Sequence, residues 1–136
     1  MEFSEKNFDM KFIEPKIHGF IDYMAGVILI ATSSFFSFDN ATEAMIPALV
    51  GIIQITYSLF TRYEFGFFSG ISMRKHLTLD MIGGTVLVTS SLIFGFASEI
   101  WQAYMVLGIF EILVAFLTKP YSQRRHYRHH GVRVHQ

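Results

Sequence analysis

Histidine and aspartate occur twice in this chain at one spacing, and this pattern is the first that could support chemistry. His18 precedes Asp22 by four residues, and His76 precedes Asp80 by four residues. On an α-helix, residues four apart lie on the same face. Imidazole and carboxylate groups from different helices are ligands that helical bundles use for transition metals. With Glu111, these residues form a candidate site for a divalent transition metal.

Three other interpretations of these residues stay open. In the structural one, which the sequence favours, each aspartate accepts a hydrogen bond from its own or the equivalent histidine, and the protein is a membrane scaffold or assembly component. In another, Glu111 gains and loses a proton within a homo-oligomer. The last is an unrecognised membrane enzyme or redox component. No catalytic residues are assigned, because no nucleophile motif, phosphate-binding loop or HExxH motif is visible and cysteine is absent.

Four long apolar segments must position these side chains. They cover roughly residues 17–38, 44–61, 77–97 and 101–118. Each is close to the ~20 residues that a helix needs to cross ~30 Å of hydrocarbon. Charged residues make up only 16% of the chain, below the quarter that is typical of soluble domains, and the segments lack a continuous polar stripe. The sequence therefore predicts an all-α fold, an integral membrane four-helix bundle.

The basic residues predict the orientation of this bundle. Neither lysine nor arginine occurs between Ile17 and Thr61 or between Leu77 and Thr118. By the positive-inside rule, both termini and the middle loop are cytoplasmic, in the cell or inner membrane. The 11 basic residues balance 11 acidic ones, so we expect the lipid bilayer, and no nucleic acid, as a partner. The basic residues are Lys6, Lys11, Lys16, Arg62, Arg74, Lys75, Lys119, Arg124, Arg125, Arg128 and Arg133.

An internal repeat relates the two halves of the chain. A shift of 58 residues superimposes His18, Asp22, Gly26, Leu29, Ser33, Phe36 and Phe38 on His76, Asp80, Gly84, Leu87, Ser91, Phe94 and Phe96. A shift of 57 residues superimposes Gly51 on Gly108 and Thr61 on Thr118, and it places Gln54 at the position of Glu111. We therefore predict two parallel αα-hairpin repeats, residues 16–64 and 74–121, related by an axis along the membrane normal.

Small and polar residues recur along one face of each segment and predict where the helices touch. In lipid, small residues mark helix contacts because they let the backbones approach closely. The four stripes should therefore face one another. They are His18, Asp22, Gly26, Leu29 and Ser33; Pro47, Gly51, Gln54, Ser58 and Thr61; His76, Asp80, Gly84, Leu87 and Ser91; and Tyr104, Gly108, Glu111, Ala115 and Thr118. The rings of Trp101 and Tyr104 are expected at the outer membrane boundary.

Two arms flank the transmembrane domain, residues 16–119. The N-terminal arm, residues 1–15, carries Phe8 and Phe12 four residues apart, which predicts a short helix on the inner leaflet that Pro15 ends. The C-terminal tail, residues 120–136, is rich in histidine and arginine. We expect it to be solvated and to favour anionic lipid. A metal-binding histidine tract is the alternative for the tail.

The duplicated hairpin also resembles a known family. Thr32-Ser33-Ser34 and Ser90-Ser91-Leu92 precede the stretches FFSF and IFGF near the ends of the two equivalent segments. A short hydrophobic hairpin used twice, with a small-residue patch before a terminal Phe, resembles the SPW-repeat family of small integral membrane proteins. The resemblance covers about Lys16 to Lys119. It implies a membrane domain without an established biochemical activity and supplies no catalytic residues.

Overall fold

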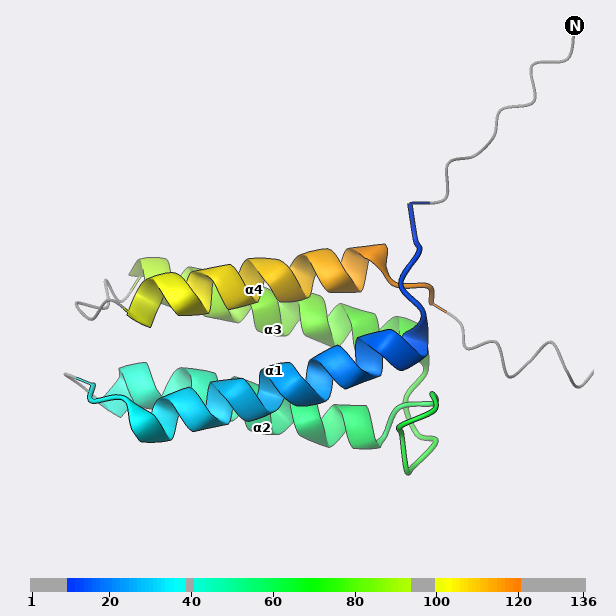
Figure 1. Ribbon diagram of the computed structural model, residues 1–136, viewed down its shortest axis with the longest axis horizontal. Helices are drawn as coiled ribbons and strands as arrows, with labels where there is room; N and C mark the ends of the chain where they lie inside the picture. The colour runs from blue at the N-terminus through cyan, green and yellow to red at the C-terminus, as the bar shows by residue number, and fades with distance from the viewer. Residues whose placement is uncertain (1–9, 39–40, 94–99, 121–136) are drawn as a thin grey trace, which may run out of the picture.

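The computed structural model describes residues 10–38, 41–93 and 100–120. These residues form four helices, α1 (Pro15–Phe35), α2 (Ala41–Leu59), α3 (Met73–Ile93) and α4 (Ile100–Leu117), which lie together as a bundle (Figure 1). All four are long and apolar enough to cross a membrane. The predicted all-α bundle of four apolar helices is confirmed. Each helix begins slightly earlier than predicted, and α1, α2 and α4 also end slightly earlier.

Successive helices run in opposite directions along the bundle (Figure 1). Residues 10–14, the loop 60–72 and residues 118–120 therefore lie at one end of the molecule, which we call the terminal end. The first turns of α1 and α3 and the last turns of α2 and α4 also lie there. This arrangement brings the predicted site residues of α1 and α3 to the same end of the bundle.

The start of α1 differs from the expectation. Pro15 is the first residue of the helix, a position that proline favours because it has no N–H to leave unpaired and its φ already suits a helix. Residues 10–14 are not helical, so the predicted interfacial helix is wrong for this part of the arm; the rest of the arm lies outside the described residues. Instead, the backbone N–H groups of Phe12 and Ile13 donate to the Leu117 carbonyl, and the Lys119 N–H donates to the Ile13 carbonyl. The N-terminal segment is thereby tied to the end of α4.

Glycines let the helices cross closely within each hairpin. A Cβ atom built on Gly51 would lie 2.6 Å from the carbonyl oxygen of Gly26, and one on Gly108 would lie 2.6 Å from the carbonyl oxygen of Gly84. Any larger side chain at these positions would force the backbones apart. α1 packs extensively on α2, and α3 on α4, whereas the two hairpins touch through far fewer residues. The interface between the hairpins is the thinner one.

The predicted stripes form the interior of the bundle. Every stripe residue is buried except Ser33, which is half-buried. The outer faces carry exposed large apolar side chains, among them Phe20, Ile53, Ile82 and Val106. Polar groups inside and apolar groups outside are the pattern expected of helices surrounded by lipid.

Tyr104 corrects one expectation from the sequence. Its side chain is only 2% exposed and packs between Leu29 and Leu87 in the apolar core of the bundle. The interpretation of this ring as an anchor at the outer membrane boundary is therefore wrong. The apolar cluster of Tyr104 occupies the half of the bundle away from the terminal end, and the polar interior occupies the other half.

Candidate metal centre

The four residues of the duplicated His/Asp pattern meet in the bundle. His18 and Asp22 lie in the first two turns of α1, and His76 and Asp80 lie in the first two turns of α3. Each of the four residues is at most 3% exposed. One ligand atom from each residue can be chosen so that all four lie within 4.8 Å of one another. Two helices that hardly touch through their backbones are thus joined through these side chains.

The closest contacts in this cluster run between the two helices. His76 Nε2 lies 2.6 Å from Asp22 Oδ2, and His18 Nε2 lies 2.9 Å from Asp80 Oδ2. Within each helix, the histidine Nε2 and aspartate Oδ2 atoms are 3.3 Å apart. Of the two pairings considered from the sequence, the one with the equivalent histidine is therefore the closer. The two Nε2 atoms, from His18 and His76, are 3.2 Å apart.

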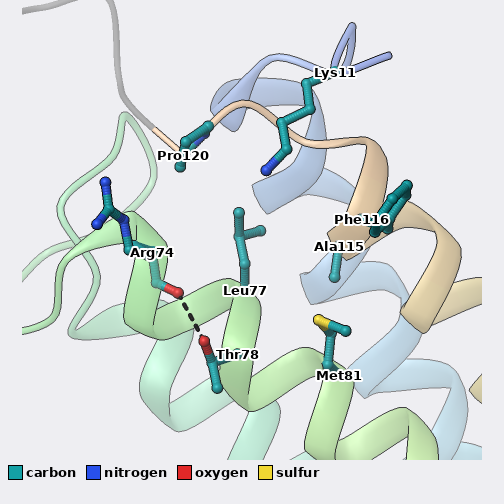
Figure 2. Close-up of a pocket in the computed structure, with 8 residues that line it drawn as sticks. All are labelled: Lys11, Arg74, Leu77, Thr78, Met81, Ala115, Phe116 and Pro120. Atoms are coloured by element: carbon teal, nitrogen blue, oxygen red, sulfur yellow. Dashed lines mark hydrogen bonds between the residues drawn. The ribbon is translucent and has the colours of Figure 1, made fainter. Parts of the chain in front are cut away.

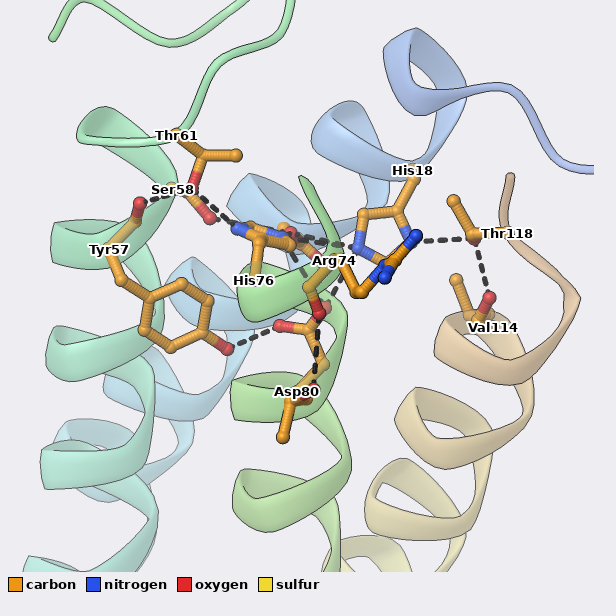
Figure 3. Close-up of polar contacts among 11 residues, drawn as sticks. His18, Tyr57, Ser58, Thr61, Arg74, His76, Asp80, Val114 and Thr118 are labelled. Carbon is orange, nitrogen blue, oxygen red and sulfur yellow. Dashed lines mark hydrogen bonds and ion pairs between the residues drawn. The ribbon is translucent and has the colours of Figure 1, made fainter. Parts of the chain in front are cut away.

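Two threonines at the ends of the returning helices fix the other side of each imidazole ring (Figure 3). His18 Nδ1 is 2.9 Å from Thr118 Oγ1, and His76 Nδ1 is 2.8 Å from Thr61 Oγ1. Each threonine hydroxyl already donates to the carbonyl four residues earlier, at 2.6 Å and 2.7 Å respectively. The hydroxyl oxygens must therefore accept from Nδ1–H of the rings. This leaves both Nε2 atoms facing the cluster.

The aspartates are also supported by side chains of α2. The Tyr57 hydroxyl donates to Asp80 Oδ1, as Figure 3 shows, and Ser58 Oγ donates to Asp22 Oδ2 at 3.3 Å. The sequence placed Ser58, Thr61 and Thr118 on the interior stripes but gave them no role. The available signal was the match of Thr61 to Thr118 in the internal repeat, one just beyond the end of each returning helix.

The loop 60–72 closes the cluster at the terminal end. The Tyr63 ring is 5% exposed, and it lies edge-on to His76 with the ring centroids 5.7 Å apart. Gly19 makes room for this ring, because a Cβ atom there would overlap Tyr63. Tyr63 also packs on Met73 and Ala115. The Tyr63 ring therefore covers the cluster at the terminal end.

Glu111 does not join the four clustered residues. It is buried on α4, but the group of mutually close ligand atoms consists of His18, Asp22, His76 and Asp80. Neither oxygen of the Glu111 carboxyl has a hydrogen-bond partner among the described residues, and the same holds for both amide atoms of Gln54. Gln54 is the polar neighbour of this carboxyl, although no hydrogen bond of normal geometry joins them. The structure thus brings together four of the five predicted ligands.

The hydrogen bonds from the two histidines to the threonines leave the cluster with excess negative charge, so it needs positive charge at its centre. With Nδ1–H donated to a threonine, a neutral imidazole presents only a lone pair at Nε2, and this lone pair faces a carboxylate oxygen. Two neutral imidazoles and two carboxylates carry a net charge of about −2. Two protons or one divalent cation would balance it, so the geometry suits either a hydrogen-bonded clamp or a metal centre.

Fold and site together describe a protein with four plausible membrane spans around a buried His/Asp cluster. Comparison with known protein families, curated proteins and solved structures gives no match to the chain. Membership of the SPW-repeat family therefore stays a prediction.

Proposed function

We propose that this protein is an integral membrane scaffold whose two helical hairpins are held together by one buried divalent transition metal. His18, Asp22, His76 and Asp80 are the ligands, and each hairpin supplies one histidine and one aspartate. The metal would strengthen the interface at which the helices pack least, that between the hairpins. This combines the scaffold interpretation of the sequence with its metal-binding alternative.

The close approach of the two histidine nitrogens carries the proposal. In a hydrogen-bonded clamp, both rings would be protonated with their Nε2 atoms 3.2 Å apart, so that two positive charges would repel each other. A metal ion bound by two neutral rings avoids this repulsion. In a tetrahedral zinc site with ligands at about 2.0 Å, neighbouring ligand atoms are about 3.3 Å apart. The Nε2–Nε2 and Nε2–Oδ2 separations here run from 2.6 to 3.3 Å. These five separations are therefore close to the spacing in a zinc site, and the whole set of four ligand atoms lies within 4.8 Å.

Charge balance in the membrane also supports a divalent ion. An ionised aspartate at the centre of a membrane helix costs about 2.5–3.5 kcal/mol on insertion scales. A divalent ion with two neutral histidines and two aspartates forms a neutral complex, which removes much of this cost. The hydrogen-bond partners of the histidines suit a metal as well, because metal-bound histidines usually donate their other N–H to a fixed acceptor, and Thr61 and Thr118 provide such acceptors.

The closed surroundings favour a structural role for the metal. All four ligands come from the protein and are at most 3% exposed, and Tyr63 covers the terminal end. Structural zinc sites are four-coordinate and closed, whereas catalytic ones keep a position for water or substrate. The proposed role is therefore to stabilise the assembly of the hairpins rather than to catalyse a reaction.

The proposed arrangement is a parallel repeat with both termini in the cytoplasm. Equivalent contacts in the two halves support the repeat: the Gly26–Gly51 and Gly84–Gly108 crossings, and the two His–Thr pairs. The distribution of basic residues supports the orientation. Because the chain has no cysteine, single cysteines test the topology cleanly. In intact cells, an impermeant maleimide should label Asn40→Cys and spare Ser69→Cys; the reverse pattern would contradict the orientation.

Metal analysis tests the function directly. The full chain, purified without a histidine tag, should contain about one divalent metal per chain by elemental analysis, and His76→Ala should lose it. His126→Ala, in the tail, is the control for adventitious binding and should keep the metal. Circular dichroism checks that each variant is folded. A metal-free wild type that stays metal-free after incubation with zinc would establish the hydrogen-bonded clamp and end the metal proposal.

A further inference from the structure

A second candidate site lies at the terminal end, on the outside of the bundle. A cavity of about 380 Å³ opens between α3, α4 and the N-terminal segment. Lys11 and Arg74 border it, and Figure 2 shows them on either side of the Leu77 side chain. The described residues that line the cavity include these two cations and no acidic side chain. The two basic side chains give the rim of the cavity an attraction for anions.

The two cations are held in place by the fold. Lys11 precedes the two residues whose N–H groups bond to the Leu117 carbonyl, so its backbone is fixed against the end of α4. Arg74 is the second residue of α3, where the positive end of the helix dipole adds to the attraction for an anion. The fold thus fixes the backbone from which each basic side chain extends.

The floor of the cavity is apolar and continues onto the surface of the bundle. Leu77 and Ala115 are buried beneath it, while Met81 and Phe116 are exposed large apolar side chains on its outer side. Met81 lies one turn along α3 from Leu77, further from the terminal end. An apolar path therefore leads from the charged rim toward the part of the helix surface that the bilayer would surround.

We propose that this cavity binds an anionic phospholipid, with its phosphate between Lys11 and Arg74 and an acyl chain along Met81 and Phe116. Basic pockets between transmembrane helices are known to suit anionic headgroups. A free phosphate ion would gain from the charges but not from the apolar path, so the two ligands can be told apart. This site involves none of the metal ligands and is separate from the predicted lipid binding by the C-terminal tail.

Lipid binding to the purified full chain tests the proposal. Delipidated protein in detergent is titrated with phosphatidylglycerol or phosphatidylcholine, and the first bound lipid is quantified by native mass spectrometry. The double variant Lys11→Gln/Arg74→Gln should bind phosphatidylglycerol about thirty-fold more weakly, because the loss of each cation lowers the affinity about fivefold. Phosphatidylcholine binding should hardly change. Each single variant should show about a fivefold loss.

A matched control removes the same charge elsewhere at the terminal end. Lys16 and Lys75 are exposed cations there that do not line the cavity, and Lys16→Gln/Lys75→Gln should weaken phosphatidylglycerol binding less than about threefold. The tail is present in every variant, so its contribution cancels. Equal losses in both double variants would overturn the proposal, as would displacement of the lipid by millimolar inorganic phosphate.

Discussion

Replacing Thr61 by valine should weaken the metal site while leaving its four ligands in place. Thr61 is fully buried and accepts from His76 Nδ1–H at 2.8 Å. A metal ion holds the proton on Nδ1, and in Thr61→Val that N–H would face a methyl group with no water to replace the hydroxyl. Without the metal, the ring can move its proton to Nε2 and donate to Asp22. The loss of this hydrogen bond therefore raises the free energy of the metal-bound state more than that of the metal-free state.

The magnitude follows from the burial of both partners. An unsatisfied buried donor costs about 1–3 kcal/mol, which corresponds to an affinity loss of about fivefold to 150-fold. Removing a residue that hydrogen-bonds to a metal ligand typically weakens metal binding about 10-fold to 100-fold, which lies in the same range. We therefore expect zinc affinity to fall about 10-fold to 100-fold, with the stoichiometry unchanged.

Competition with a chromophoric chelator in detergent measures this affinity. Thr56→Val is the matched control, since Thr56 lies on α2 shortly before Thr61, also donates to the carbonyl four residues earlier, and is exposed. It should bind zinc as the wild type does. If Thr61→Val and Thr56→Val bound zinc equally well, the proposed role of threonine in orienting the ring would be refuted.

Three further substitutions test other parts of the structure. Gly108→Ala should lower the unfolding free energy in mixed micelles by about 1–3 kcal/mol through overpacking, because its Cβ would lie 2.6 Å from the Gly84 carbonyl oxygen. The control Gly83→Ala should change the unfolding free energy little, because the nearest atom to its Cβ would be 3.7 Å away. Glu111→Gln should keep the full metal content by elemental analysis and unfold no more easily, and stoichiometric metal loss would instead make Glu111 a ligand. Tyr57→Phe should reduce zinc affinity about 10-fold or more in the same competition assay; an unchanged affinity would show that the Tyr57–Asp80 contact does not support the metal site.

Much of the fold could be predicted from the sequence because two physical signals are strong in a membrane. Apolar segments of about 20 residues set the helices, and the stripes of small and polar residues set their inward faces, as Gly51 and Gly108 show. Pro15 was misread because the sequence alone does not distinguish a proline that ends a helix from one that begins it. Tyr104 was misplaced because aromatic residues near a helix end suit either the membrane interface or the core.

The candidate site was predicted in part. The repeated spacing of four residues gave the four clustered side chains, since helix geometry fixes which residues share a face. Glu111 was included because it lies on a stripe that faces the interior, but such a stripe does not tell how close a side chain comes to those of the other helices. The roles of Thr61 and Thr118 depend on contacts between helices, which the sequence does not specify.

X-ray absorption spectroscopy of the zinc-loaded protein tests the central claim most directly, because it reports the ligands themselves. We predict four nitrogen or oxygen ligands at about 2.0–2.1 Å, with the outer-shell scattering of two imidazole rings, and the loss of one ring in His76→Ala. A six-coordinate oxygen shell without imidazole scattering, or a spectrum unchanged by His76→Ala, would contradict a metal held between the two hairpins.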